Sequence, residues 1–247
     1  GKAMVTEPLE VRLPVPPLRP WVSHYWRSQG NTDPDYAVIP DGAVDMVLQV
    51  EGPRRRALVY GTSTTCRRVP LVPGGDYLGV RFQPARARHL LRVAAHELTD
   101  TWEPVRAVLG FDLGDVPEAM DRDNVFDRLD RLLLKALGRT TMDTTLADRA
   151  VACIAAHRGQ IAIDALADEL GCGRRRLERS FLPAVGVAPK VFARICRFGH
   201  ARDLLDGTGH QLAEVALQAG YYDQSHLSQE FRRFAGLSPS RYRFSTD

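Results

Sequence analysis

The chain has 247 residues, of which 44% are hydrophobic and 26% are charged, a composition typical of one or two globular domains. No apolar run approaches the roughly 18–20 residues that a membrane-spanning helix needs, and the first residues lack the apolar stretch of a signal peptide. A soluble, cytoplasmic protein without membrane contact is therefore expected. The cysteines are far apart and show no paired spacing, which argues against a disulfide framework or a zinc site: Cys66, Cys153, Cys172 and Cys196.

The chain up to about residue 85 has the pattern of a β-rich domain. Short apolar runs alternate with turn signals such as Asp41-Gly42 and Pro73-Gly74-Gly75. Short strands at such regular spacing favour a small β-barrel or sandwich. The predicted strands are Val22–Trp26, Ala37–Ile39, Val44–Val50, Ala57–Tyr60 and Tyr77–Phe82.

From about Arg86 onward the pattern becomes helical. One apolar stripe recurs at helical spacing before the break at Gly138-Arg139-Thr140-Thr141, and its members are Val125, Leu129, Leu132, Leu133 and Ala136. We therefore expect a domain boundary at residues 138–143, between an N-terminal domain over residues 4–140 and a C-terminal domain over residues 144–247. The predicted fold class is α+β, with a small N-terminal β-barrel that carries helices and an all-α C-terminal domain.

The positive charge of the chain is concentrated in the C-terminal domain. The net charge is +3, yet residues 1–143 hold 19 basic and 19 acidic residues, whereas residues 144–247 hold 14 basic and 11 acidic residues. A domain that carries all of the excess positive charge suits a polyanionic partner such as nucleic acid.

The C-terminal domain also contains an internal repeat. Ala167–Gly171 matches Ala216–Gly220, 49 residues later, and Leu177–Phe181 matches Leu227–Phe231, 50 residues later. Two further matched pairs are Gly186 with Gly236 and Pro189 with Pro239. One structural unit is therefore present twice, at residues 163–182 and 212–234, and Pro189–Leu205 is predicted to form a helix that joins the two copies.

Each unit has the pattern of a helix-turn-helix. In the first unit, a short helix with an apolar face from Ile163 to Leu170 ends at Gly171, because glycine accepts the left-handed conformation that follows a helix. A second helix over Arg174–Leu182 places Leu177 and Phe181 four residues apart on one face. In the second unit, Asp223 stands at the N-cap position of the corresponding helix.

The outward faces of these second helices carry the candidate contacts with double-stranded DNA. Because Leu177 and Phe181 face inward, Arg175 and Arg179 face outward on the opposite side of the helix. A solvated helix face also carries arginine and glutamine, so a single unit would not decide between the two interpretations. Two units in tandem, in the only positively charged region, favour DNA binding. The candidate set is Arg174, Arg175, Arg176, Glu178, Arg179, Gln224, Ser225, Ser228, Gln229, Arg232 and Arg233.

The C-terminal region closely resembles the DNA-binding domain of AraC/XylS-type bacterial transcriptional regulators. The longest match runs through the second unit, from Ala216 to Arg243. The first unit departs from the family at one position, where Gly173 replaces the Ser or Thr that often precedes the recognition helix. Glycine is a tolerable cap, a few tenths of a kcal/mol weaker than serine. The resemblance implies a sequence-specific, nucleoid-associated regulator, with RNA polymerase as a candidate partner.

Three N-terminal stretches resemble the sensor domains of one subgroup of these regulators: Ile39 to Val50, Gly79 to Pro84 and Glu97 to Asp100. This resemblance implies a cupin-like barrel that binds an effector or forms a homodimer. Metal binding is not expected, because His24, His89 and His96 lack the spacing of ligands on adjacent strands. No catalytic motif and no cofactor-binding loop is present, so we expect neither an enzyme nor a bound cofactor.

One face of the predicted sheet could line an effector pocket. If the mixed faces of two strands point into a barrel, polar anchors come from Asp45, Gln49, Tyr77 and Arg81, and apolar walls from Trp21, Tyr25 and Trp26. The alternative is that these polar faces are solvated and the tryptophans belong to the core. Two functions therefore remain open: a regulator controlled by a small-molecule effector, and a DNA-binding regulator whose N-terminal domain serves only dimerisation or protein contacts.

Overall fold

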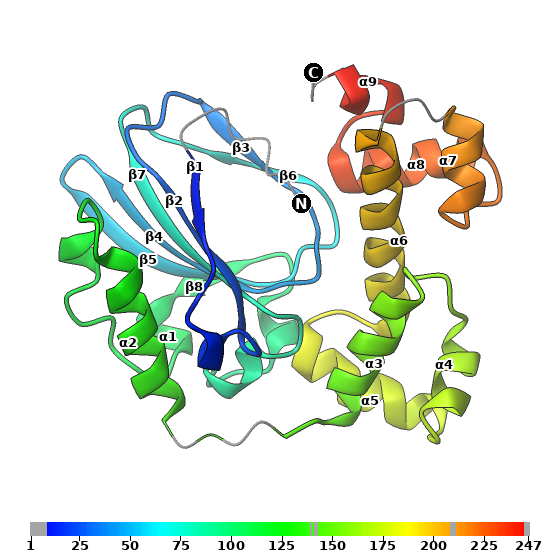
Figure 1. The fold of residues 1–247 in the computed structure, drawn as a ribbon, viewed down its shortest axis with the longest axis horizontal. Helices are drawn as coiled ribbons and strands as arrows, with labels where there is room; N and C mark the ends of the chain where they lie inside the picture. Colours follow the sequence, from blue (N-terminus) through cyan, green and yellow to red (C-terminus); the bar gives the residue numbers. More distant parts are fainter. Residues whose placement is uncertain (1–8, 139, 141–142, 208–210, 245–247) are drawn as a thin grey trace.

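The computed structural model describes residues 9–138, 140, 143–207 and 211–244. It contains an N-terminal domain built on a β-sheet and a C-terminal domain made of helices, which lie side by side (Figure 1). The α+β class predicted from the sequence is confirmed. No helix in this described part of the chain is long and apolar enough to cross a membrane.

The N-terminal domain is an antiparallel sheet with the strand order β1-β2-β7-β4-β5-β8. These strands are β1 (Leu9–Arg12), β2 (Val22–Ser28), β7 (Asp76–Phe82), β4 (Asp45–Glu51), β5 (Arg54–Tyr60) and β8 (Trp102–Pro104). A separate pair is formed by β3 (Asp35–Val38) and β6 (Arg67–Pro70). All five predicted strands are present. The predicted barrel is not closed, because within the described residues β1 and β8 are edges of the sheet.

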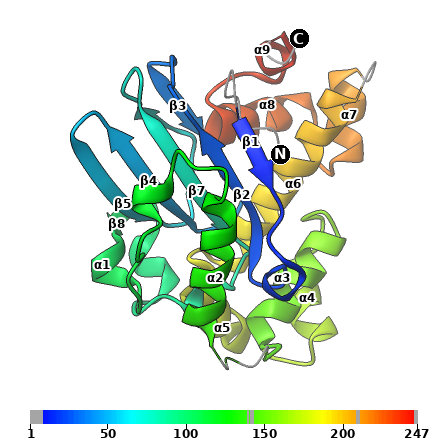
Figure 2. The same ribbon diagram turned by 60° about the vertical axis from the view of Figure 1, so that its left-hand side comes forward.

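One face of the sheet is covered by α2 (Val125–Leu137), as Figures 1 and 2 show. Alternate strand residues point to opposite faces, and the residues under α2 form the core of this domain. The Tyr25 ring stacks on Phe126, and its hydroxyl donates to Asp130 Oδ1 over 2.9 Å. The buried carboxylate of Asp130 also accepts from Val15 N, so it ties the helix to two segments of the sheet domain.

The C-terminal domain consists of two helical units joined by one long helix. The first contains α3 (Leu146–Ala156), α4 (Ile163–Glu169) and α5 (Arg174–Val185), and the second contains α7 (Leu212–Gln218), α8 (Gln224–Ala235) and α9 (Pro239–Phe244). The joining helix α6 (Pro189–Asp206) contributes Phe192 to the core of the first unit and Phe198 to the core of the second. The predicted connecting helix and both pairs of short helices are confirmed.

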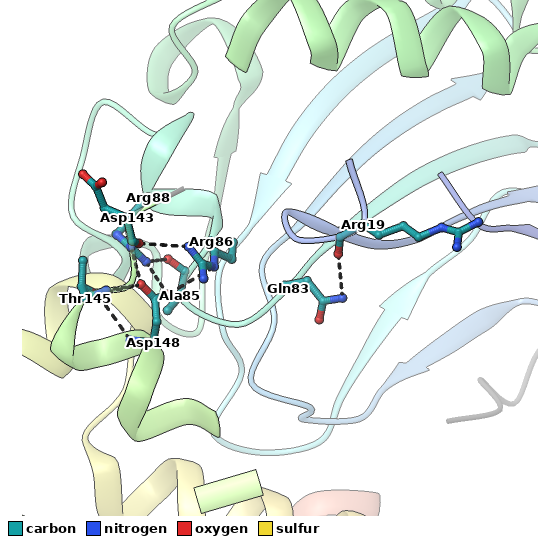
Figure 3. Close-up of polar contacts among 8 residues, drawn as sticks. All are labelled: Arg19, Gln83, Ala85, Arg86, Arg88, Asp143, Thr145 and Asp148. Carbon is teal, nitrogen blue, oxygen red and sulfur yellow. Dashed lines mark hydrogen bonds and ion pairs between the residues drawn. The ribbon is translucent and has the colours of Figure 1, made fainter. Parts of the chain in front are cut away.

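An ion-pair cluster around Asp148 joins the two domains (Figure 3). The carboxylate of Asp148, at the start of α3, accepts from Arg88 Nη1 over 3.0 Å and from Arg88 Nη2 over 2.7 Å. Arg86 Nε lies 3.3 Å from the same carboxylate, and Thr145 N donates to it over 2.8 Å. Burial alone would raise the pKa of Asp148, but the hydrogen bonds from Arg88 and Thr145 lower it below its ordinary value of 3.8. The group is therefore ionised, and its contacts are fully formed, at neutral pH.

We expect Asp148→Asn to lower the stability of the chain by about 2–3 kcal/mol at pH 7, because it leaves two largely buried guanidinium groups without their counter-charge. Asparagine keeps an oxygen that can still accept from Thr145 N. In a protein of this length the melting temperature should fall by roughly 5–10 °C. The matched control is Asp127→Asn, which breaks an exposed pair with Arg12 and should cost less than about 0.5 kcal/mol. Equal shifts for the two variants in calorimetry would contradict a stabilising role for the cluster.

Candidate nucleic-acid interface

The first helix-turn-helix is formed by α4 and α5. Its turn contains Gly171 with a φ of +65°, the left-handed conformation expected from the sequence. Leu177 and Phe181 are fully buried against the core of the unit. Their burial fixes the rotation of α5, so the other side of the helix is presented to solvent.

Three of the candidate arginines on α5 are exposed and have no hydrogen bond or ion pair to any described residue: Arg175, Arg176 and Arg179. Arg174 differs, because its Nε lies 3.0 Å from Glu178 and its Nη1 lies 3.3 Å from Asp164 of α4. Glu178 is half-buried and engaged in this pair. The structure therefore leaves three guanidinium groups available for a partner and holds the fourth on the protein.

The second helix-turn-helix is formed by α7 and α8. The carboxylate of Asp223 accepts from His226 N over 2.7 Å, which confirms the predicted N-cap. Leu227 and Phe231 are buried, whereas Gln224, Ser225 and Gln229 are exposed along the other side of α8. Ser228 is half-buried, and Arg232 and Arg233 are exposed. This face carries fewer charges than the face of α5.

One functional contact of α8 was not predicted from the sequence. Glu230 is buried and forms a two-pronged ion pair with Arg194 of α6, at 2.5 Å and 3.2 Å. Breaking such a pair would leave a buried charge, so it holds α8 firmly on the joining helix. The only signal in the sequence was a charged residue next to the inward-facing Phe231.

The seven candidate effector residues do not gather in one place. The strand register puts Asp45 and Arg81 side by side on the sheet face opposite α2, where Arg81 makes two hydrogen bonds of 2.9 Å to Asp45. Gln49 and Tyr77 are paired at the other end of that face, and Trp26 packs over Gly79 between the two pairs. Trp21 and Tyr25 instead belong to the core under α2. These two residues therefore do not line a pocket with the other five.

A cavity of about 230 Å³ opens between this sheet face and the C-terminal domain. Among its lining residues are Tyr36 and Val38 of β3, Arg81 of β7 and Arg202 of α6. Of the seven candidate effector residues, Arg81 is the one that lines it. A molecule in this cavity would therefore touch both domains.

One group of possible metal ligands occurs among the described residues: Cys153, His157 and Glu169, whose donor atoms lie within 4.8 Å of one another. The His157 Nδ1 donates to the Cys153 carbonyl oxygen over 2.9 Å, so this nitrogen carries a proton rather than a free lone pair. Burial and the Glu169 carboxylate raise the pKa of Cys153, so its thiol also keeps its proton. The group is explained by its own hydrogen bonds, and we assign no metal to it.

Comparison with known protein families identifies the C-terminal domain. A family model described as a helix-turn-helix domain matches residues 166–244, and one described as a domain of unknown function (DUF6597) matches residues 10–104. The transcriptional activator RhaR of Escherichia coli (strain K12) is 29% identical over 104 residues, 42% of this chain and 37% of RhaR. The C-terminal domain is therefore similar to the helix-turn-helix domain of AraC/XylS-type transcriptional regulators. It matches little more than a third of the length of RhaR, so the activity of RhaR as a whole is not transferred to it.

Two solved structures are similar to part or all of this chain. ToxT of Vibrio cholerae aligns with 97% of this chain and 99% of its own, at a TM-score of 0.50 and 10% identity. At that identity the likeness shows the two-domain fold alone. The DNA-binding domain of AdpA, solved in complex with a target DNA, is 31% identical, covers 42% of this chain and 93% of that domain, and has a TM-score of 0.39.

We call α5 and α8, the second helices of the two helix-turn-helix units, the recognition helices; their N-caps should respond to substitution in opposite directions. Asp223→Ala removes the bond to His226 N and should cost about 1 kcal/mol. Gly173 has an extended backbone with a φ of −74° and open space where a Cβ would lie, so Gly173→Ser should stabilise the chain by a few tenths of a kcal/mol. Urea unfolding at pH 7 measures both. Destabilisation by Gly173→Ser would show that α5 does not begin where the structure places it.

Proposed function

We propose that this protein is a sequence-specific DNA-binding regulator of transcription, controlled by a small molecule that binds its N-terminal domain. The DNA-binding part rests on one observation: two helix-turn-helix units are held on a single helix, and each presents an exposed polar or basic face on its second helix. Exposed helix faces of this kind read bases and phosphates in the major groove. RNA polymerase and a second copy of the chain are further proposed partners, and the cytoplasm is the proposed location.

The length of α6 leads to a prediction about the operator. Its 18 residues span about 27 Å, and α6 packs into the cores of both units, so it keeps them apart as a rigid element. Two recognition helices on one face of DNA lie roughly 34–36 Å apart. One chain should therefore protect two consecutive major-groove segments about 10 base pairs apart. Hydroxyl-radical footprinting measures this, and protection of a single groove segment would contradict it.

The exposed side chains of α5 and α8 lead to a prediction about base preference. Arg175 and Arg179 are free to place a two-pronged donor edge on guanine, whereas Gln224 and Gln229 suit adenine. Arg179→Ala should therefore remove a guanine preference worth about 1–3 kcal/mol at one or two positions of one half-site. Selection of binding sites from random DNA with the wild type and the variant measures this effect.

The control is Arg174→Ala, which removes an arginine already paired with Glu178 and Asp164 and should leave the selected motif unchanged. If Arg179→Ala selects the wild-type motif and only binds it more weakly, Arg179 contacts a phosphate and the assignment is wrong.

The effector part rests on the cavity between the sheet and α6. Its walls belong to the N-terminal domain except for Arg202 of α6, so a ligand there could change how α6 is held against the sheet. A compound that binds only the folded chain should raise its melting temperature, which allows a metabolite collection to be screened with the intact protein. Val38→Trp adds bulk to the cavity wall and should abolish the shift, whereas Val72→Trp, at an exposed site outside the cavity, should preserve it. A shift that survives Val38→Trp would place the ligand elsewhere.

A further inference from the structure

The loop between β5 and β6 contacts both helix-turn-helix units. We call residues 61–66 the bridging loop. On one side, Thr62 is fully buried and its hydroxyl donates to Val185 O at the end of α5 over 2.6 Å. On the other side, Cys66 N donates to Arg233 O near the end of α8 over 3.0 Å. A single short segment of the N-terminal domain therefore reaches both recognition helices.

The bridging loop also packs on two equivalent positions of the internal repeat, the glycines that follow the two helices. Gly186 and Gly236, 50 residues apart, follow the last residues of α5 and α8, and both have the left-handed conformation, with φ of +95° and +70°. A Cβ at Gly186 would lie 3.1 Å from the Thr62 hydroxyl, and one at Gly236 would lie 3.4 Å from Cys66 Sγ. The loop thus packs closely on the same structural feature of each unit.

Helix ends explain why these contacts form. The last carbonyl groups of a helix have no partner within the helix and need donors from elsewhere. The loop and its neighbour supply them: Thr62 for Val185 O, Thr99 for Gly186 O and Cys66 for Arg233 O. The N-terminal domain caps the C-terminal ends of both recognition helices and leaves their N-terminal ends exposed.

The bridging loop is itself held in shape by one residue. Asp100 has a φ of +58°, and its carboxylate accepts from Thr64 N over 2.8 Å and from Thr64 Oγ1 over 2.6 Å. Its backbone N–H donates to Thr62 O over 3.1 Å. Such multiple bonds over a few residues make the loop a stiff connector rather than a flexible one.

From these contacts we infer that the bridging loop sets the spacing between the two DNA half-sites that the chain accepts. The joining helix α6 fixes the distance between the two units and the rotation of each on that helix, but bending or torsion of α6 itself would still change the angle between them. A second stiff connection between α5 and α8 opposes that deformation. Each base pair inserted between the two half-sites rotates one half-site relative to the other by about 36° around the DNA axis. Two recognition helices held at a fixed angle should therefore bind with only a few spacings between the half-sites. This inference rests on the proposed DNA binding.

The test uses the intact chain with Thr62→Val and Thr99→Val combined, which removes both hydroxyl donors to α5 at nearly unchanged volume. The control is Thr65→Val, in the same loop, where no hydrogen bond to a described residue is made. Affinities are measured for the selected operator and for versions with one base pair added or removed between the half-sites. For each base pair added or removed, the affinity of the wild type and of the control should fall about tenfold or more, whereas that of the double variant should fall about twofold or less. The affinity of the double variant for a single half-site should equal that of the wild type.

Hydrogen exchange without DNA should rise at the ends of both α5 and α8 in the double variant, which a purely local defect at α5 would not produce. A second pair of variants tests the other contact: Cys66→Pro removes the donor to Arg233 O, and Cys66→Ala keeps it. A double variant that retains the spacing preference of the wild type overturns the inference while the proposed function stands. A wild type that binds no DNA overturns the proposed function, and the inference with it.

Discussion

Burial of α6 in two separate hydrophobic cores is the constraint on which the C-terminal domain depends. Phe192 enters the core of the first unit and Phe198 that of the second, and a buried aromatic side chain contributes roughly 1.5–3 kcal/mol. The ion pair between Arg194 and Glu230 adds a polar contact to the second interface. Because each unit is anchored to the same rigid helix, the rotation of each recognition helix about its own axis is fixed by Leu177 and Phe181, or by Leu227 and Phe231. The exposed faces of α5 and α8 therefore have defined orientations before any partner arrives.

The N-terminal domain holds the two units unequally. The first unit is attached at the start of α3, through Asp148 with Arg86 and Arg88, and again at the end of α5. Ala85, in the segment that carries these arginines, is itself buried in the core of the first unit. The second unit is attached by Cys66 N, by the packing of Cys66 on Gly236 and by Ile39, which packs against its core. Changes in the N-terminal domain can therefore move the second unit more readily than the first, which is bound by charge-assisted hydrogen bonds that are costly to break.

Local patterns in the sequence predicted the elements that local physics determines. Helical periodicity, the cap at Asp223 and the left-handed Gly171 are properties of a few neighbouring residues, and the structure has them as expected. The short strands β1, β6 and β8 were missed, because a segment such as Arg67–Pro70 has no apolar alternation and becomes a strand only by pairing with β3. Tyr25 and Trp26 were placed in one pocket, although adjacent strand residues point to opposite faces.

The pairs Tyr25–Asp130 and Arg194–Glu230 join residues 105 and 36 positions apart, and no local pattern encodes such partners. The stretch Glu97 to Asp100 was noted only as a resemblance, whereas the structure shows that Asp100 shapes the bridging loop.

The N-terminal end of each recognition helix is exposed, whereas its C-terminal end is contacted by the N-terminal domain, and the polarity of the helix backbone explains this difference. The N-terminal end presents free N–H groups and a partial positive charge, which suit a phosphate backbone, and on α5 it also carries exposed arginines. The C-terminal end presents free carbonyl groups, which suit donors such as Thr62 Oγ1 and Cys66 N of the N-terminal domain. The contacts with the N-terminal domain therefore do not cover the exposed face. Under the proposed function, a ligand bound to that domain would therefore act by moving the helices as rigid bodies, which changes the geometry of the two faces and leaves their chemistry unaltered.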